Sequence, residues 1–264
     1  MKFETIKVEV DGAIGRLTLN RPDSLNALSS KMMHELTEAA HWFDEQPEVR
    51  VVIISGAGRA FCAGADLKDT GRKAATSDPE TSWMDRRAAA QSGSRMIEAV
   101  EKMRALTIAS VHGYVVGGGL LLMVAADLRV AAENTIFSIP EVELGIPLAW
   151  GGIPRLVREI GPAMTKELVI TCRRFSPQEA KAMGMINRVV AYEDLQRETE
   201  ELAELTASMP AVPVAITKEH VNAVSRAMAG PSAYADGDVL LGAFGSAESA
   251  QARRDYVEKR LKRK

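Results

Sequence analysis

Residues 112–141 read HGYVVGGGLLLMVAADLRVAAENTIFSIPE, and this stretch decides how the rest of the chain can be arranged. Three consecutive glycines at positions 117–119 end one apolar segment and open another. Glycine has no Cβ, so a second backbone or a ligand can approach it closely. If a helix begins here, its first N–H groups lack intrahelical partners and favour negative charge. Glu141, which follows a proline, adds a carboxylate, and this pairing suits proton transfer beside a carbonyl group.

The composition is that of an ordinary globular protein. The chain has 264 residues, 46% of them hydrophobic and 26% charged, which favours one large domain or a domain with an appendage. Its net charge is −2, which gives no reason to expect a nucleic-acid partner. The two cysteines, Cys62 and Cys172, have neither metal-ligand nor disulfide spacing, so we expect no metal site. No targeting segment and no membrane-length apolar run is present, so we expect a cytoplasmic protein without a membrane partner.

Strand and helix patterns alternate through the first two thirds of the chain. Residues 3–10 and 14–19 flank an Asp-Gly turn and predict a β-hairpin, and residues 49–55 are typical of a strand buried on both faces. Further strands are expected at residues 108–111, 128–131 and 189–190, and helices at 29–43, 83–104, 152–160, 166–171 and after Ser176. From residue 193 onward every segment reads as helix. We predict an α/β core over residues 1–195 and a helical region over residues 196–264.

Four segments of the chain resemble, in order, the enoyl-CoA hydratase/isomerase family, also called the crotonase family. They are LNRPDSLNALS (19–29), GAGRAFCAGADLK (56–68), HGYVVGGG (112–119) and FSIPEVELGIPLAWGGIPRL (137–156), with a weaker echo in DYVEKR (255–260). The resemblance implies a spiral core of repeated ββα turns and an acyl-CoA thioester substrate, with no prosthetic group. It also implies a homotrimer or a dimer of trimers, assembled through the helical C-terminal region.

The resemblance assigns an oxyanion hole to two backbone N–H groups. The first matches Ala65 and the second Gly118. Such donors stabilise the charge that builds on the thioester oxygen when a proton leaves the α-carbon, and losing one typically costs about 2.7–4 kcal/mol in hydrolases. Hydratases of the family usually carry two glutamates. One position, three residues beyond the second oxyanion glycine, is Leu121 here, and the other, in the FxxPE motif, is Glu141.

The loss of one glutamate favours isomerisation over hydration. Hydration must activate water at C3 and deliver a proton at C2, which two carboxylates share naturally. Moving a double bond from C3=C4 to C2=C3 needs only one base, and single-glutamate isomerases are known in the family that the chain resembles. An apolar neighbour such as Leu121 would raise the pKa of Glu141 from about 4.3 toward neutrality. The alternative role for Glu141 is a buried, paired acid that holds a loop.

Other functions remain open at this point. A hydratase that takes its second acid from Asp69 or Asp85, in or beside the polar stretch 69–82, is one, and decarboxylation or thioester hydrolysis are others. A non-catalytic acyl-CoA binding protein would have no need of Glu141. A structural subunit of a larger fatty-acid complex is a third alternative, and a homo-oligomer alone in solution would argue against it. Glu143 lies two residues beyond Glu141, and we expect it to serve elsewhere.

Candidate residues for the rest of the substrate follow the same resemblance. We expect Leu148 and Trp150, together with Leu121, to narrow the acyl pocket, because family members usually have a small residue where Trp150 stands. Lysine and arginine side chains are expected at the CoA phosphates, with Lys259 supplied by a neighbouring subunit. The complete set of CoA-binding candidates is Asn26, Ala27, Arg59, Ala63, Lys68, Gly117, Tyr256 and Lys259.

Overall fold

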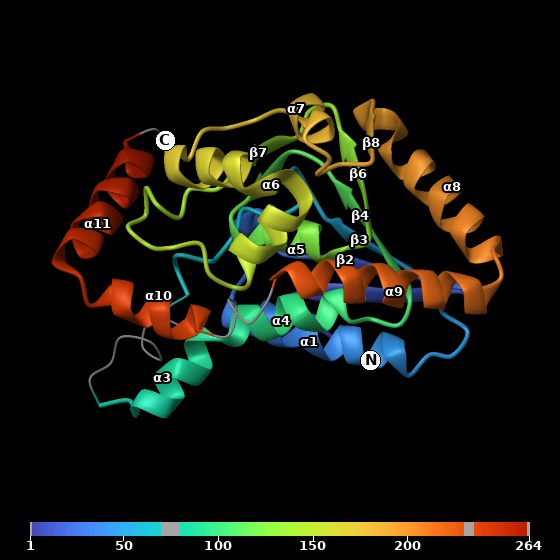
Figure 1. Cartoon of the computed structure of the whole chain (residues 1–264), viewed down its shortest axis with the longest axis horizontal. Coiled ribbons are helices and arrows are strands. Elements are labelled where there is room, and N and C mark those ends of the chain that lie inside the picture. Colours follow the sequence, from blue (N-terminus) through green and yellow to red (C-terminus); the bar gives the residue numbers. More distant parts are fainter. Residues whose placement is uncertain (1, 70–79, 230–234, 263–264) are drawn as a thin grey trace.

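A six-stranded sheet forms the centre of the structure (Figure 1). In the computed structural model, residues 2–69, 80–229 and 235–262 are described. The strands of this sheet are β1 (Ile6–Asp11), β2 (Ile14–Leu19), β3 (Val51–Gly56), β4 (Leu106–Val111), β6 (Leu128–Ala132) and β8 (Arg188–Val190), in the order β1-β2-β3-β4-β6-β8. The predicted hairpin is confirmed by the antiparallel pairing of β1 with β2, and every other pairing is parallel.

Two short strands form a second sheet and reveal the repeating unit of the fold. They are β5 (Tyr114–Val116) and β7 (Ile136–Ser138), which pair in parallel. β4, β5 and α5 (Gly118–Ala125) make one ββα turn, and β6, β7 and α6 (Gly152–Thr171) make the next. The α/β fold with a crotonase-like spiral core is therefore confirmed. Residue patterns alone did not indicate β5 or β7, each of which has three residues.

The helices follow the predicted capping signals. Ser29 caps α1 by accepting a hydrogen bond from Met32 N–H, and Ser176 caps α7 in the same way. The predicted helix over residues 83–104 is divided at Gln91, and the two predicted segments after residue 152 are joined in α6 across a kink at Gly161. The helices not yet given are α1 (Ser30–Asp44), α3 (Trp83–Ala90), α4 (Ser92–Glu101), α7 (Pro177–Ala182), α8 (Leu195–Ser208), α9 (Ala211–Ala229), α10 (Asp236–Phe244) and α11 (Ala247–Leu261), with short 3-10 turns at Pro22–Ser24 and Tyr192–Asp194.

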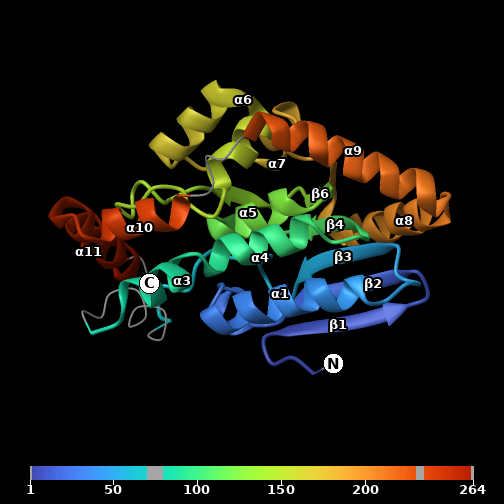
Figure 2. The same cartoon turned by 60° about the horizontal axis from the view of Figure 1, so that its bottom comes forward.

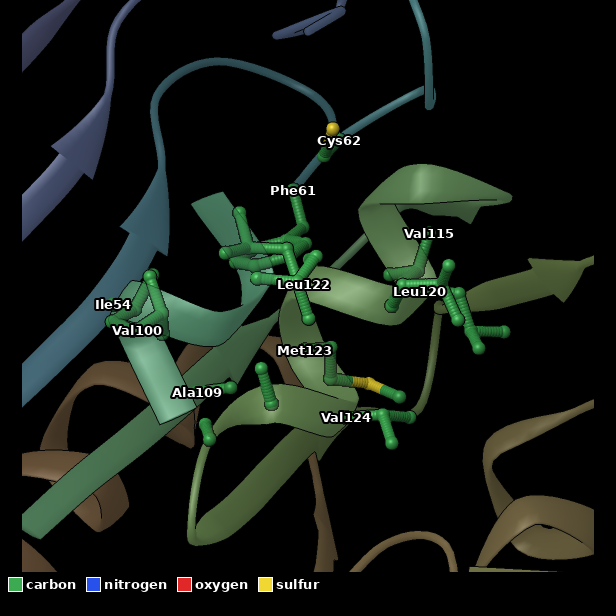
Figure 3. Close-up of a cluster of buried hydrophobic side chains, with 14 of the residues drawn as sticks. Ile54, Phe61, Cys62, Val100, Ala109, Val115, Leu120, Leu122, Met123 and Val124 are labelled. Atoms are coloured by element: carbon green, nitrogen blue, oxygen red, sulfur yellow. The ribbon is translucent and has the colours of Figure 1, made fainter. Parts of the chain in front are cut away.

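Helix α5 lies in the middle of the hydrophobic core. All of its residues are buried, and Figure 3 shows its side chains among those of β4, α4 and the loop around Phe61. The other face of the sheet is covered by α8, whose Leu195, Leu202 and Ala203 pack with residues of β3, β4 and β6. Packing on every side fixes the start of α5, so a site built there is held rigidly.

The C-terminal helices α10 and α11 lie at one end of the molecule, next to α3 (Figure 2). Arg87 of α3 forms an ion pair of 2.6 Å with Asp238 of α10. Within the described parts of the chain, no helix is long and apolar enough to cross a membrane.

Candidate active site

A loop after β3 lies against the N-terminus of α5. Cys62 pairs with β5, since its carbonyl oxygen accepts a hydrogen bond of 3.0 Å from Val116 N–H. Two residues on, Gly64 has φ +87°, and a Cβ there would lie 2.7 Å from Val116 O and 3.6 Å from Gly118 N. Only glycine allows this approach without strain. The loop therefore brings the backbone of Ala65 close to the first residue of α5.

Two backbone N–H groups at this junction are free to bind an oxyanion. Ala65 and Leu28 form a parallel β-bridge, whose two hydrogen bonds use backbone groups of the residues before and after Ala65. The N–H of Ala65 itself therefore points away from Leu28. Gly118 opens α5, and its N-cap residue Gly117 supplies no side-chain cap. Among the described residues, neither N–H has a hydrogen-bond acceptor. Backbone donors beside a helix N-terminus can stabilise developing negative charge.

Glu141 lies in the turn after β7, with its carboxylate against Gly117. A Cβ at Gly117 would overlap Oε1 of Glu141 and lie 3.2 Å from its Cδ, and Gly117 itself has φ +50°. Although the residue as a whole is half-buried, Oε2 is closed to solvent and has no partner among the described residues. Burial raises the pKa of Glu141 from 4.5 to about 7, and a hydrogen bond from its own backbone offsets only part of this effect. An unpaired acid does not fit the loop-holding alternative.

The remaining wall beside the donors is apolar. Leu121 is 1% exposed and Leu148 5% exposed, and both lie close to Gly152, where a Cβ would be 2.8 Å from Leu148 Cγ and 3.0 Å from Leu121 Cδ1. The indole of Trp150 packs on Gly118, where a Cβ would be 3.0 Å from Cε3 of the ring. The structure thus brings together the three predicted pocket residues around the predicted donor.

The other acids considered as a second catalytic group have partners elsewhere. Asp69 accepts hydrogen bonds from the backbone and hydroxyl of Ser30 at the start of α1, at 2.6 and 2.8 Å. Asp85 accepts from the serine that caps α3. Glu143 is exposed and lies 3.3 Å from Lys259 Nζ. Residues 70–79, most of the polar stretch named above, lie outside the described residues.

Asn26 and Ala27 brace the site from within the protein. Asn26 is fully buried, and its side-chain amide donates to Ala57 O and Ala60 O at 2.9 Å. Its own carbonyl oxygen accepts from the Cys62 thiol, and Ala27 O accepts from Arg21. The polar groups of these two candidates are therefore engaged in hydrogen bonds within the protein. Those of Asn26 hold the loop after β3, a role that the sequence did not indicate.

The other CoA candidates separate into two groups. Arg59 and Lys68 are both exposed on the loop after β3. Ala63 lies on the same loop, and its N–H donates to Leu25 O at 2.9 Å. Tyr256 is buried and Lys259 exposed, both on α11. Lys259 Nζ lies 3.3 Å from Glu143 Oε1 of its own chain, and its donation to a neighbouring subunit stays a prediction.

One interaction at the site carried no sequence signal. Gly151 N–H donates to Asp236 Oδ2 at 2.5 Å, which ties the turn after Trp150 to the first residue of α10. The two residues are 85 positions apart, so no local pattern connects them. His112 lies with Nε2 at 2.8 Å from Gly58 O. In the described ranges, no group of three or more His, Cys, Asp or Glu side chains is arranged to hold a metal ion.

A spiral of ββα turns with an unpaired buried carboxylate beside two backbone donors defines an enzyme of the crotonase fold. The chain belongs to the enoyl-CoA hydratase/isomerase family, whose sequence model matches residues 9–263. Members of this family act on CoA thioesters.

Individual relatives carry both activities in their names. A probable enoyl-CoA hydratase from Mycobacterium bovis is 35% identical over 264 residues, covering 98% of this chain and 97% of that one. A peroxisomal Delta(3,5)-Delta(2,4)-dienoyl-CoA isomerase from Arabidopsis thaliana is 38% identical over 191 residues, covering 71% of this chain and 69% of that one. An enoyl-CoA hydratase/isomerase structure from Mycobacterium paratuberculosis superposes with a TM-score of 0.87 at 28% identity, covering 97% of this chain and 100% of that one. Similarity therefore does not decide between the two reactions.

Proposed function

We propose that this acyl-CoA enzyme is an enoyl-CoA isomerase with Glu141 as its single base. The observation that carries the proposal is the solvent-shielded Oε2 of Glu141, which lies beside an apolar wall and has no partner in the described part of the chain. At the position of the second family glutamate stands Leu121, which is 1% exposed. A single carboxylate suits a reaction that moves one proton and adds no water.

The reaction follows from these groups. The N–H groups of Ala65 and Gly118 would hold the thioester oxygen of a 3-enoyl-CoA. Glu141 would take a proton from C2, the electrons of that C–H bond passing into the enolate. The same carboxylic acid would then return the proton at C4, leaving a C2=C3 double bond. A pKa of about 7 suits a group that must both take and return a proton near neutral pH.

The remaining features of the substrate site are part of the same proposal. Arg59 and Lys68 are exposed cations on the loop next to the oxyanion donors, and we assign them to the CoA phosphates. Proton transfer of this kind needs no prosthetic group. Exposed apolar side chains on α9, such as Val212 and Ile216, support assembly of the helical region into a homotrimer or a dimer of trimers. We place the enzyme in the cytoplasm.

Hydration is the second candidate, because several relatives carry hydratase in their names. A hydratase would need a second acid near C3. The acids considered for that role, Asp69, Asp85 and Glu143, are engaged at helix starts or with Lys259. A non-catalytic acyl-CoA binding protein would have no use for an unpaired carboxylate, since burying one is unfavourable.

The test supplies a 3-enoyl-CoA and a 2-enoyl-CoA in parallel, following double-bond position by absorbance and water addition by mass. Glu141→Gln is compared with Glu143→Gln, which makes the same atom replacement at an exposed acid two residues further along the chain. Migration without water uptake, lost in Glu141→Gln and kept in Glu143→Gln, is the expected result. Rapid water uptake by the 2-enoyl substrate would replace the isomerase with a hydratase. Tight acyl-CoA binding without either reaction would favour the binding protein.

A further inference from the structure

The turn at Trp150 and Gly151 has an unusual backbone. Both residues are left-handed, with φ +59° and +67°. For a bulky residue such as tryptophan this conformation is a genuine outlier, and it persists only where the surroundings enforce it. Trp150 is also 9% exposed, so its ring is part of the protein interior. The turn therefore requires contacts that hold it in place.

The indole of Trp150 lies between two glycines on different helices. A Cβ at Gly93 of α4 would be 2.5 Å from Nε1 of the ring, and a Cβ at Gly118 of α5 would be 3.0 Å from Cε3. Any side chain at either position would displace the ring. The ring thus packs directly on Gly118, whose N–H is the second proposed oxyanion donor.

Polar contacts from two sides hold the backbone of the turn. On one side, Gly151 N–H donates to Asp236 Oδ2 at 2.5 Å. On the other, Arg155 donates to Gly151 O at 3.1 Å, and its guanidinium is itself fixed by Glu101 Oε2 at 2.6 Å. Arg155 lies on α6, which the turn opens, whereas Asp236 comes from the C-terminal helical region. Asp236 therefore links that region to the turn.

We infer that Asp236 is a positioning residue for the oxyanion hole. Its hydrogen bond to Gly151 keeps the indole of Trp150 against Gly118, and the indole keeps the Gly118 N–H aimed at the thioester oxygen. This inference rests on the proposed function. It predicts that loss of the bond slows proton removal at C2 more than it weakens binding of acyl-CoA, because the donor matters most once the oxygen carries charge.

The test compares three variants of the full chain. Asp236→Ala removes the acceptor, and Asp236→Asn keeps an oxygen that can accept from Gly151 N–H. Asp238→Asn is the matched control, because Asp238 lies on the same turn of α10 but pairs with Arg87 of α3. Two readouts apply, namely kcat and KM for double-bond migration, and the rate at which C2 protons of a saturated acyl-CoA exchange with deuterated water.

For Asp236→Ala we expect kcat and the exchange rate to fall about tenfold or more, with KM changed less than about threefold, because small displacements of a catalytic group have large effects. Asp236→Asn should recover most of the rate, and Asp238→Asn should keep it. Wild-type kcat in Asp236→Ala, or an equal fall in Asp238→Asn, would overturn the inference. An inactive wild-type protein would instead refute the proposed function.

Fluorescence gives a separate readout if Asp236→Ala is poorly folded. Of the three tryptophans, Trp42 and Trp83 are replaced by phenylalanine, so that Trp150 alone reports. In this background Asp236→Asn should keep the blue-shifted emission of a buried indole. Asp236→Ala, or Asp236→Leu as a second variant without an acceptor, should shift it to the red. Unchanged emission in both acceptor-free variants would show that the ring does not depend on Asp236.

Discussion

Glu101 and Glu141 are both shielded from solvent, yet their surroundings differ in one respect. Glu101, at the end of α4, lies 2.6 Å from Arg155 and 2.8 Å from Arg158, both on α6. Glu141 has no cation beside it, and its Oε2 has no partner among the described residues. Burial alone would raise the pKa of Glu101, but the two arginines bring it below its ordinary value, whereas burial raises the pKa of Glu141 to about 7.

The difference shows that burial of an acid does not by itself indicate function. Removing a carboxylate from water is unfavourable, and cations on a neighbouring helix offset that cost for Glu101. At Glu141 a hydrogen bond from its own backbone offsets only part of this cost, and no cation in the described structure does. The fold therefore keeps a destabilised charge next to two free backbone donors, which is the combination expected of a catalytic base.

The largest effect should come from replacing Glu141 by glutamine. We expect kcat for double-bond migration to fall by a factor of about 10²–10⁴, the usual contribution of a general base. The melting temperature should stay the same or rise, because a neutral amide is less costly to bury than an unpaired charge. Steady-state kinetics and thermal unfolding measure the two quantities. A large loss of stability would mean that Glu141 is structural.

Replacing Glu101 by glutamine should give the opposite result. Removing one partner of a buried ion pair typically costs about 3–5 kcal/mol. Here the buried guanidinium of Arg155 loses the carboxylate that it pairs with, while Arg158 keeps its ion pair with Glu159. Urea unfolding would show this loss directly. Because Glu101 also fixes the Arg155 guanidinium that donates to Gly151 O, kcat of the folded protein should fall, but far less than in Glu141→Gln. A drop of about hundredfold or more would argue that this ion-pair network takes part in catalysis directly.

The two glutamates should also give stability profiles of opposite slope with pH. The folded pKa of Glu141 is near 7 and its ordinary value 4.5, so the native state holds the proton longer than the unfolded chain. Its contribution therefore falls as pH rises between these values, by on the order of 3 kcal/mol. Glu101, with a lowered pKa, contributes stability above its ordinary pKa and loses it as pH falls further. The difference between wild-type and each glutamine variant, measured from about pH 2 to 8, isolates each slope.

A second carboxylate at position 121 would sharpen the comparison. Leu121→Glu puts an acid on the apolar wall and should destabilise the protein by about 1–3 kcal/mol, as expected for a buried, unpaired polar group. If two acids are what hydration requires, the variant should gain water addition to a 2-enoyl-CoA. Leu121→Gln, which has the same shape without the charge, is the control. Equal hydration by both variants would contradict the two-carboxylate argument.

The sequence predicted the parts of the site that short motifs carry. Ala65, Gly118 and Glu141 each stand in a recognisable segment, and the structure brings their backbone and side-chain groups to one place. Strong local patterns likewise predicted the hairpin and the buried strand β3. These features could be predicted because neighbouring residues determine them.

Contacts between distant segments could not be predicted in the same way. Glu101 gives no sign in the sequence that Arg155 and Arg158 will neutralise it, since more than 50 residues separate them. The left-handed turn at Trp150 depends on Asp236, which is further away still. In each case the partner is chosen by how α6 and α10 pack, and packing is a property of the whole chain.

The two cysteines differ in a way that offers a practical handle on the active-site turn. Cys62 is fully buried, its thiol donates to Asn26 O, and burial raises its pKa to about 12, so it will be inert toward alkylating reagents. Cys172 is only half-buried, and its sulfur accepts a hydrogen bond from Glu143 N–H, two residues beyond Glu141. A fluorinated or spin-bearing thiol reagent would therefore label the native chain at a single position. Attached to Cys172 at alkaline pH, it would report spectroscopically on motion of the turn that carries the base, with no mutation introduced.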